Sequence, residues 1–444
     1  MIKPEFIEKL IERVDLVSLI AGFVELRKTG TTLEGICPFH EEKSPSFKVY
    51  PATSEVGHYY CFGCNKHGNA LSFAMERIGL SFGDAVKYLA QREGLRVEYE
   101  RKQQPEESKR DSDEQQARQR TLSVLRKASG EFYRRLLSTE AGPARDELNR
   151  RGIEAETILR YSLGYAPDAW NTLTRNFTSS HDTLIDAGLA VRRQNSEGAY
   201  DFFRNRLMFP IYDIKGSVVA FGGRKMAQED GLGPKYLNSP ETIVFKKGAE
   251  LFGLYQAKDA VIKSGEVVVA EGYFDVITPA QHGISNVVST CGTALTEGQL
   301  SKLLRIAKRI TFCFDGDTAG HKATWRAAEM LLSTLTDEHE IRFCTLPATH
   351  DPDSLVREQG PDAFTALLRD SPTLAEYVSA KLIQKARLTS PEGKTAFIKE
   401  AIRYWRKFQA PVLAFFFRKH ICTAVGIQEE EFDFLVSTTQ RKAA

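Results

Sequence analysis

The sequence has no apolar run long enough to cross a membrane as a helix, which takes roughly 20 residues. The N-terminal segment MIKPEFIEKLIERVDLVSLI mixes acidic residues into an amphipathic helical pattern and lacks the features of a secretory signal peptide. Both absences predict a cytoplasmic protein. There is also little excess charge of either sign. Because the net charge is only +2, contact with a polyanion would have to come from local basic clusters.

Cysteine is scarce, with seven in 444 residues. An odd number in a chain without an export signal argues against a framework of disulfides. Four are isolated in apolar surroundings, which predicts reduced core residues: Cys291, Cys313, Cys344 and Cys422. The other three fall within residues 37–64, which suggests a shared role.

These three cysteines and one histidine form two pairs of metal ligands. CPFH at 37–40 and CFGC at 61–64 each separate their ligands by two residues, so one tight turn can point both at one ion. Three thiolates and one imidazole complete a tetrahedral set typical of structural zinc: Cys37, His40, Cys61 and Cys64. Alternating aromatic and β-branched residues between the pairs predict strands, hence a zinc ribbon. The alternative is a chance pairing of core cysteines. His58 and His67 lie nearby, and we expect both in exposed loops.

Aromatic residues and lysines are interleaved around this zinc site, namely Phe39, Lys43, Phe47, Lys48, Tyr59 and Phe62. If exposed, such residues would stack on bases and neutralise the phosphates of single-stranded nucleic acid. A small zinc domain also needs aromatic residues for its core. For any single phenylalanine we expect this core role.

Acidic residues follow three predicted strands in the second half of the chain. The strands are apolar throughout and alternate with helical patterns, which predicts a parallel sheet covered on both faces. Because ligands bind beyond the carboxyl ends of such strands, these acids should meet at one edge. They are Glu271, Asp315, Asp317, Asp351 and Asp353.

Like charges held together call for a neutralising cation, and Mg²⁺ or Mn²⁺ prefers oxygen ligands. Two or more such ions among carboxylates are typical of phosphoryl-transfer enzymes. Glu271 belongs to a separate motif and could act as a general acid–base or as another metal ligand. The competing interpretation is a solvated acidic rim of loops.

A basic stretch precedes the acids. Residues 204–247 contain eight lysines and arginines against four acids. Arg224 and Lys235 lie in turn-rich loops beside apolar strands, where they could hold a polyanion. Taken one at a time, most lysines here are ordinary surface charge.

Residues 100–120 contain one alanine as their only apolar residue. Such a stretch cannot bury enough surface to offset the entropy lost on ordering, which predicts a flexible tether. One long helix with a charged face is the alternative, because apolar residues continue with helical spacing at Leu122, Leu125, Phe132 and Leu136. The tail, from about residue 372, has helical patterns.

Several motifs occur in one order: CPFHEEKSPSF, CFGCNKHGNA, RLMFPI, FGGR, PKYLNSPET, FKKG, EGYFDV, FDGDTAG and DPDSL. Over roughly residues 1–430 they closely resemble bacterial replicative DNA primases of the DnaG type. The acidic motifs alone resemble the TOPRIM domain, which topoisomerases and some nucleases share. The resemblance implies a multidomain α/β chain with a zinc ribbon over 1–99, a flexible tether over 100–120, a basic α+β part over 121–258, a TOPRIM-like parallel sheet over 259–370 and a helical subdomain over 371–444.

The resemblance also assigns residue roles. The zinc ligands match the four residues named above. Glu271, Asp315 and Asp317 match catalytic acids, and these three with Asp351 and Asp353 match the magnesium site, supported by Asp275. Residues that match basic positions handling nucleotide or the template–primer duplex are Arg224, Lys235 and Lys247, with Arg151 as a weaker match. We add Arg204 and Arg206 from the basic stretch.

The implied activity is RNA primer synthesis on single-stranded DNA within a primosome, with one structural Zn²⁺ and two or more Mg²⁺ or Mn²⁺ ions. The implied partners are the template, ribonucleoside triphosphates and the RNA–DNA hybrid product. We expect the family's helicase-binding domain to be absent, which leaves a replicative helicase open as a partner. The segment between the zinc knuckles is also longer than expected.

Two other functions compete. A TOPRIM nuclease or topoisomerase fits the acids, although the latter needs a nucleophilic tyrosine in an additional large domain. A non-enzymatic zinc-ribbon adaptor that binds DNA fits the cysteines but leaves the three acidic motifs without a role.

Overall fold

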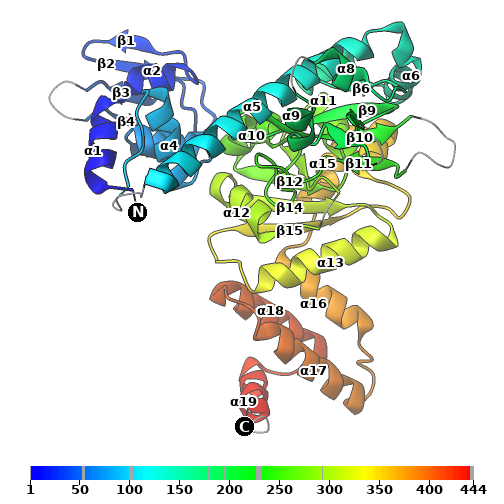
Figure 1. Cartoon of the computed structure of the whole chain (residues 1–444). Helices are drawn as coiled ribbons and strands as arrows, with labels where there is room; N and C mark the ends of the chain where they lie inside the picture. Colours follow the sequence, from blue (N-terminus) through cyan, green and yellow to red (C-terminus); the bar gives the residue numbers. More distant parts are fainter. Residues whose placement is uncertain are drawn as a thin grey trace. The chain divides into compact units, whose positions relative to one another are not determined.

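The structure is a computed structural model that describes residues 2–52, 56–99, 105–177, 180–194, 197–226, 233–292 and 294–440 (Figure 1). The chain divides into two compact units. One comprises Met1–Gly265 with Thr296–Ile306, and the other comprises Glu266–Leu295 with Ala307–Ala444. This division falls after the predicted boundary at 258/259. Across the described residues, no helix combines the length and hydrophobicity needed to span a bilayer.

The N-terminal region contains the predicted ribbon. Its elements are α1 (Pro4–Arg13), α2 (Leu16–Ala21), β1 (Arg27–Thr29), β2 (Thr32–Gly35), β3 (Phe47–Tyr50), β4 (His58–Cys61), β5 (His67–Gly68), α3 (Ala70–Ile78) and α4 (Phe82–Arg92). The strands form an antiparallel sheet in the order β1-β2-β3-β4-β5. Phe47 is fully buried, which confirms the core role expected of a phenylalanine here, and Tyr59 is buried as well. Phe62 is 60% exposed, so for this residue the expected core role was wrong.

The rest of the first unit is built around a second antiparallel sheet. Its elements are α5 (Pro105–Leu136), η1 (Thr139–Ala141), α6 (Gly142–Arg150), α7 (Ala155–Arg160), β6 (Gly164–Ala166), α8 (Thr172–Asn176), α9 (His181–Asp186), β7 (Ala190–Arg192), β8 (Ala199–Asp201), β9 (Arg206–Tyr212), β10 (Val218–Lys225), β11 (Tyr236–Asn238), α10 (Leu254–Ser264) and α12 (Glu297–Ile306). The main sheet has the order β11-β10-β9-β6, and β7 pairs with β8. This is the predicted α+β part.

Helix α5 corrects the prediction of a flexible tether (Figure 1). Residues 105–120 belong to one helix that runs to Leu136, so the alternative of a long helix describes them; residues 100–104 lie outside the described part. The segment is rich in Glu, Gln, Lys and Arg, which favour helices whatever their polarity. The helix is anchored further on, where Leu125, Phe132 and Leu136 are buried.

The second unit contains the predicted parallel sheet. Its elements are β12 (Glu266–Ala270), α11 (Phe274–Gln281), β13 (Val287–Ser289), β14 (Arg309–Phe314), α13 (Thr318–Leu332), β15 (Glu340–Thr345), α14 (Pro352–Gln359), α15 (Pro361–Arg369), α16 (Leu374–Lys385), α17 (Pro391–Trp405), α18 (Pro411–Val425) and α19 (Glu429–Gln440). The strand order is β13-β12-β14-β15, and all pairs are parallel. Cys313 and Cys344 are buried and free on neighbouring strands, and Cys291 and Cys422 are also buried, as predicted.

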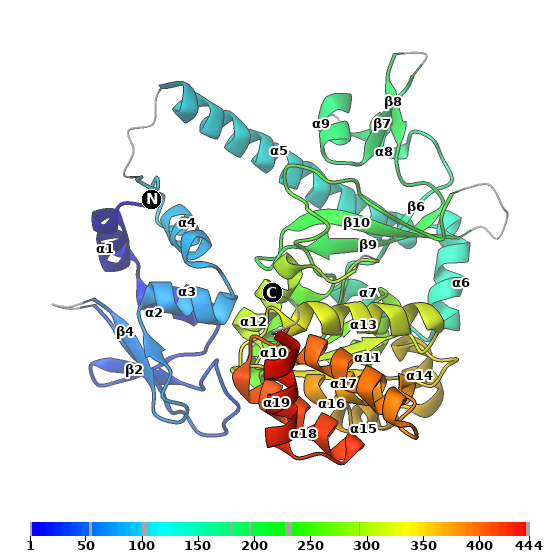
Figure 2. The same cartoon turned by 90° about the horizontal axis from the view of Figure 1, so that it is seen from below.

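An aromatic stack fixes the sheet to the helices that follow. The rings of Phe312 and Phe343, on adjacent strands, lie 5.6 Å apart, and Tyr377 of α16 stacks on Phe343 at 4.6 Å. Each buried aromatic side chain contributes roughly 1.5–3 kcal/mol of transfer free energy. Helices α16 to α19 pack against one another beyond this stack, which confirms the predicted helical tail (Figure 2).

Two glycines, Gly316 in the loop after β14 and Gly320 in the first turn of α13, lie close to other backbone. A Cβ atom on Gly316 would lie 2.2 Å from the carbonyl oxygen of Pro347, and one on Gly320 would lie 2.1 Å from that of Asp315. The Gly316 N–H also donates to the His350 carbonyl at 3.1 Å. A side chain here would therefore push apart the loops that carry the predicted acids.

We expect Gly320→Ala to destabilise the protein by about 1–3 kcal/mol, because its Cβ meets fixed backbone rather than a movable side chain. Urea denaturation followed by circular dichroism measures the effect. The matched control is Gly130→Ala in α5, where a Cβ meets nothing within 4 Å. That change should stabilise the helix by about 0.5–1 kcal/mol. Equal midpoints for the two variants would show that the close approach is not required.

Candidate functional site

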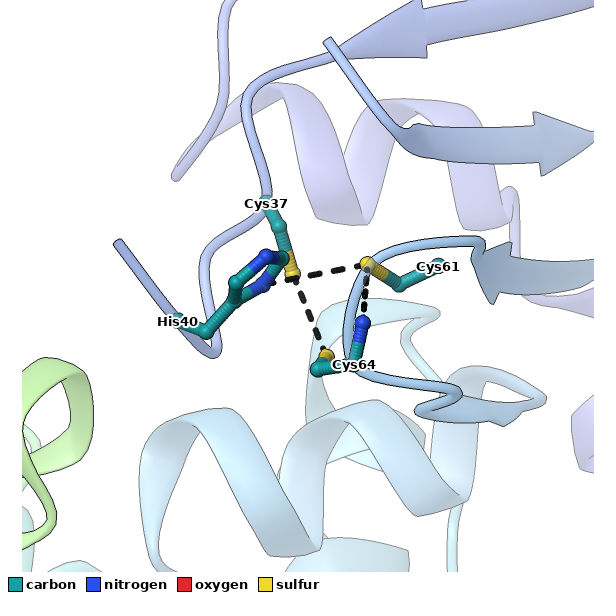
Figure 3. Close-up of side chains that lie close together, drawn as sticks. All are labelled: Cys37, His40, Cys61 and Cys64. Atoms are coloured by element: carbon teal, nitrogen blue, oxygen red, sulfur yellow. Dashed lines mark hydrogen bonds between the residues drawn. The ribbon is translucent and has the colours of Figure 1, made fainter. Parts of the chain in front are cut away.

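The four predicted zinc ligands come together in the N-terminal region. Cys37 and His40 lie in the loop after β2, whereas Cys61 ends β4 and Cys64 lies in the turn before β5. One ligand atom from each lies within 4.8 Å of the others. The Sγ atoms of Cys37 and Cys64 are 3.8 Å apart, and His40 Nδ1 is 3.8 Å from Cys61 Sγ. Figure 3 shows the four side chains pointing toward one another.

The donor set fits a zinc ion. Burial is the main cause that raises the pKa of the Cys37 thiol, and the neighbouring thiols add to it. Three thiols so close together lose their protons only if a cation compensates the charge, which Zn²⁺ does. Four such ligands would fill the positions of a tetrahedral ion and leave none for a water, which is the arrangement typical of structural zinc.

Glu42 supports this zinc site and was missed from the sequence. Its Oε1 accepts from the Cys37 N–H at 2.7 Å, and its Oε2 lies 3.3 Å from His40 Nε2. That contact turns Nδ1 of His40 toward the thiols, as outer partners of metal-bound histidines commonly do. Burial alone would raise the pKa of Glu42, but hydrogen bonds from Ser46 and the Cys37 backbone hold it below its usual value. No spacing rule points to this residue.

An aromatic surface lies on the same sheet. A cavity of about 510 Å³ is lined by Tyr50, His58, Tyr59, Tyr60, Phe62, His67 and Gly68. Tyr50 stacks on His58 with ring centres 4.5 Å apart, and Lys48 Nζ lies 5.8 Å from the Phe62 ring centre. His58 and His67 are exposed, as predicted, although they lie on strands rather than in loops.

The predicted acids follow three adjacent strands of the parallel sheet. Glu271 follows β12, Asp315 and Asp317 follow β14, and Asp351 and Asp353 come after β15. The backbone N–H of Asp315 donates to the Glu271 carboxylate. Oε1 of Glu271 is buried and has no hydrogen-bond partner among the described residues. Burial, and then the charge of Asp317, raise the pKa of Glu271.

Asp275 lies buried beneath this edge. Its Oδ2 accepts from the Gly272 N–H at 2.8 Å and its Oδ1 from the Asp353 N–H at 3.3 Å. Burial is the main cause that holds the pKa of Asp275 well above its ordinary value, followed by the charges of Asp351 and Asp315. These interactions show that acids from all three strand ends share one electrostatic environment.

Three of the predicted metal acids also hold the local fold. Asp317 caps α13 by accepting from the Gly320 N–H at 2.8 Å, and Asp351 caps α14 by accepting from the Ser354 N–H at 2.7 Å. Asp353 is 1% exposed, and its carboxylate accepts from Thr278 Oγ1 at 2.6 Å and from Arg357 at 3.1 and 3.2 Å. Asp353 would have to give up these bonds to bind a metal directly.

The acids are less tightly grouped than the zinc ligands. In the described part of the chain, only the Cys/His set brings three or more His, Cys, Asp or Glu ligand atoms within 4.8 Å of one another. An oxygen-only set that includes the unsatisfied buried Oε1 of Glu271 still suits a hard divalent cation, which takes water as its other ligands.

Two predicted basic residues meet at one carboxylate in the first unit. Arg224 on β10 lies 2.9 Å from Glu147 Oε1, and Arg151 donates to the same oxygen at 2.7 Å. Arg224 also donates to the Tyr236 hydroxyl at 2.8 Å. Lys235 is exposed, with Nζ 5.9 Å from the Tyr236 ring centre. No local sequence pattern points to Glu147.

The other predicted basic residues differ in exposure. Arg206 is buried, and its Nη1 donates to the carbonyls of Gly223 and Pro234 at 3.0 Å each. It therefore links Gly223 of β10 to Pro234, which comes just before β11, rather than presenting its charge to solvent. The Arg204 guanidinium stacks 3.4 Å from the centre of the Trp170 ring, which is 59% exposed. Lys247 is half-buried.

We expect Cys61→Ser to release zinc, because three remaining ligands hold the ion far more weakly than four. Metal analysis of the purified protein should find about one zinc per chain in the parent and much less in the variant. Cys422→Ser, a change to a buried cysteine of α18, is the control and should keep its zinc. Equal zinc in all three proteins would contradict the assignment.

Comparisons with protein families agree with this arrangement. A family model described as CHC2 zinc finger matches residues 2–105, one described as DNA primase catalytic core, N-terminal domain matches 132–258, and a Toprim-like model matches 268–356. A fourth, described as DnaB-helicase binding domain of primase, matches 375–430. Our expectation that a helicase-binding domain is absent was therefore wrong. The sequence patterns of this tail show only helices, which carry no mark of a partner.

Solved structures show the same fold. A DNA primase domain from Pseudomonas aeruginosa is 39% identical with a TM-score of 0.66, covering 71% of this chain and 99% of that one. The zinc-binding and RNA polymerase domains of Aquifex aeolicus primase are 30% identical with a TM-score of 0.60, covering 96% and 98%.

Curated relatives extend the likeness over nearly the whole chain. The DNA primase of Pseudomonas putida is 41% identical over 441 residues, which cover 98% of this chain and 65% of that protein. The DNA primase of Escherichia coli K12 is 37% identical, with coverage of 96% and 72%. The chain thus spans slightly less than two thirds of the former. With the zinc ribbon, the catalytic core and the Toprim-like sheet in one order, the chain belongs to the family of bacterial DNA primases of the DnaG type.

Proposed function

We propose that this protein is a DNA primase, a nucleotidyltransferase that synthesises short RNA primers on single-stranded DNA. The observation that carries the proposal is the acidic edge, where Glu271, Asp315 and Asp351 follow three adjacent parallel strands. An adaptor that only binds DNA has no use for buried carboxylates whose pKa is raised. Membership of the primase family supports the same reading.

The acidic edge would hold two or more Mg²⁺ or Mn²⁺ ions. Bound there, such ions supply charge stabilisation for the attacking and leaving oxygens of phosphoryl transfer. Glu271, Asp315 and Asp317 face this site as catalytic acids, joined by Asp351. Asp353 and Asp275 support them from below, because both accept hydrogen bonds from within the unit. Burial raises the pKa of Glu271, so its carboxyl group takes up a proton more readily than that of an exposed glutamate, which suits a general acid–base.

Five basic residues would bind the phosphates of nucleotides, of the template or of the RNA–DNA hybrid. They are Arg224, Lys235, Lys247, Arg151 and Arg204. Arginine forks suit phosphate oxygens, and the exposed Lys235 adds a point charge. Arg206 contributes indirectly through the carbonyls that it holds. A DnaG catalytic domain of 34% identity has been solved bound to single-stranded DNA, which supports this assignment.

The zinc region would bind the single-stranded DNA template. Its aromatic cavity offers ring faces for unpaired bases, and Lys48 lies beside Phe62 to meet a phosphate. The helical region 371–444, within which residues 375–430 match a helicase-binding model, would contact the replicative helicase of a primosome. We place the domains at 1–99, 121–258, 259–370 and 371–444, and the protein in the cytoplasm.

A product assay tests the function. The protein is incubated with single-stranded DNA, labelled ribonucleoside triphosphates and Mg²⁺ or Mn²⁺. Short RNA products are expected. Shortened or relaxed DNA instead of RNA would indicate a nuclease or topoisomerase, and retarded DNA without any product would indicate an adaptor.

Glu271→Gln and Asp315→Asn should each reduce primer synthesis by about 100-fold or more, because each removes a charge that the metal site needs. Both substitutions keep side-chain size, so unfolding midpoints should change little. The control is Asp362→Asn, an exposed acid at the start of α15. Parental activity in both site variants would reject the acidic edge as the reaction centre.

A further inference from the structure

Glu147 is an acidic residue surrounded by three arginines. We define the basic cluster as Arg150, Arg151 and Arg224, together with Tyr236, whose hydroxyl accepts a hydrogen bond from Arg224. Its Oε2 receives Arg150 at 2.6 Å, and its Oε1 receives both Arg151 at 2.7 Å and Arg224 at 2.9 Å. The Glu147 side chain is 14% exposed, and those of Arg151 and Arg224 are 13% exposed. One carboxylate therefore faces three guanidinium groups, of which Arg151 and Arg224 are largely covered and Arg150 is 61% exposed.

The electrostatics show that this carboxylate is ionised and firmly held. Burial alone would raise the pKa of Glu147, but hydrogen bonds from Arg151 and Arg150 and the charge of Arg224 hold it below its ordinary value. Hydrogen bonds between ionised partners are shorter and stronger than neutral ones. Glu147 thus restrains the two largely covered guanidinium groups, those of Arg151 and Arg224.

Arg224 is restrained from a second side. Its Nη1 donates to the Tyr236 hydroxyl at 2.8 Å, and its guanidinium carbon lies 5.4 Å from the Tyr236 ring centre. Residues 224 and 236 are direct partners on β10 and β11. Arg206 links Gly223 of β10 to Pro234, two residues before β11, by donating to both carbonyls. The orientation of Arg224 is therefore set by α6, β10 and β11 together.

We infer that Glu147 is a positioning residue that holds Arg151 and Arg224 in the orientation in which they bind nucleic-acid phosphates. This inference rests on the proposed function for the role of the two arginines. A free arginine side chain loses rotamer entropy when it meets a phosphate, whereas one already held loses less. Glu147 itself does not touch the phosphate, with which it shares its sign of charge.

The sign of one measured effect separates positioning from simple charge compensation. Glu147→Gln removes a negative charge beside the arginines. By charge alone, the variant should bind single-stranded DNA more tightly, most of all at low salt. If Glu147 positions the arginines, the variant should bind more weakly despite the gained positive charge.

The experiment measures the affinity of the full chain for a labelled single-stranded DNA oligonucleotide by fluorescence anisotropy over a range of salt concentrations. We expect Glu147→Gln to bind about tenfold more weakly, because two charge-assisted contacts lose their order. The slope of log affinity against log salt should become shallower, since fewer phosphates are neutralised.

Glu131→Gln is the matched control. Glu131 is also a largely covered carboxylate of the same unit, and it holds Arg134 at 2.6 Å and Arg135 at 2.9 Å. Its partners belong to α5 and not to the basic cluster. The control should bind DNA as the parent does, within about twofold.

Tyr236→Phe is a second variant, which tests the inference independently if Glu147→Gln fails to fold. It removes the other hydrogen bond to Arg224 at a position that is 36% exposed and changes no charge. We expect weaker DNA binding with an unchanged unfolding midpoint. Parental or tighter binding by both Glu147→Gln and Tyr236→Phe would overturn the inference.

This binding assay needs neither ribonucleotides nor a catalytic metal, so its outcome is independent of primer synthesis. If the parent makes RNA but both variants bind like the parent, the positioning role fails and the proposed function stands. If the parent makes no RNA yet both variants bind DNA more weakly, the proposed function fails and the positioning role stands.

Discussion

The repulsion between carboxylates at the edge of the parallel sheet is the constraint on which the rest of the second unit depends. Acids from three strand ends act on one another there, and Asp275 lies buried beneath them. The fold offsets the repulsion with backbone N–H groups: those of Asp315, Gly272 and Asp353 each donate to one of these carboxylates. The amino ends of α13 and α14 add favourable dipoles at Asp317 and Asp351. A cation is the remaining compensation that such a site requires.

The loops that carry these acids leave little room for variation. Gly316 and Gly320 let backbone segments pass at distances that any side chain would block. The aromatic stack of Phe312, Phe343 and Tyr377 fixes the strands behind them. A precise arrangement of charged groups thus rests on close packing of backbone and rings, which tolerates small volume changes poorly.

The first unit also brings side chains of like character close together, and there a carboxylate holds them in place. In the basic cluster one carboxylate, Glu147, orders several guanidinium groups, and in the zinc ribbon Glu42 orders His40 beside three thiols. In both places a carboxylate of the chain itself holds neighbouring side chains, the arginines beside Glu147 and the imidazole of His40 beside Glu42. Preorganisation of this kind lowers the entropy that binding would otherwise cost.

The sequence by itself determined the cluster of three cysteines and one histidine, the parallel strands and the position of the acids after them, because short spacing and apolar periodicity are local properties. The prediction of a flexible tether was wrong for residues 105–120, which are helical. It rested on their low hydrophobicity, although Glu, Gln, Lys and Arg favour helices. Only the tertiary structure decided that Arg206 is buried, that Asp353 is held by Arg357 and Thr278, and that Glu147 meets Arg224. These outcomes depend on which side chains face each other across different elements, and no local pattern encodes such pairings.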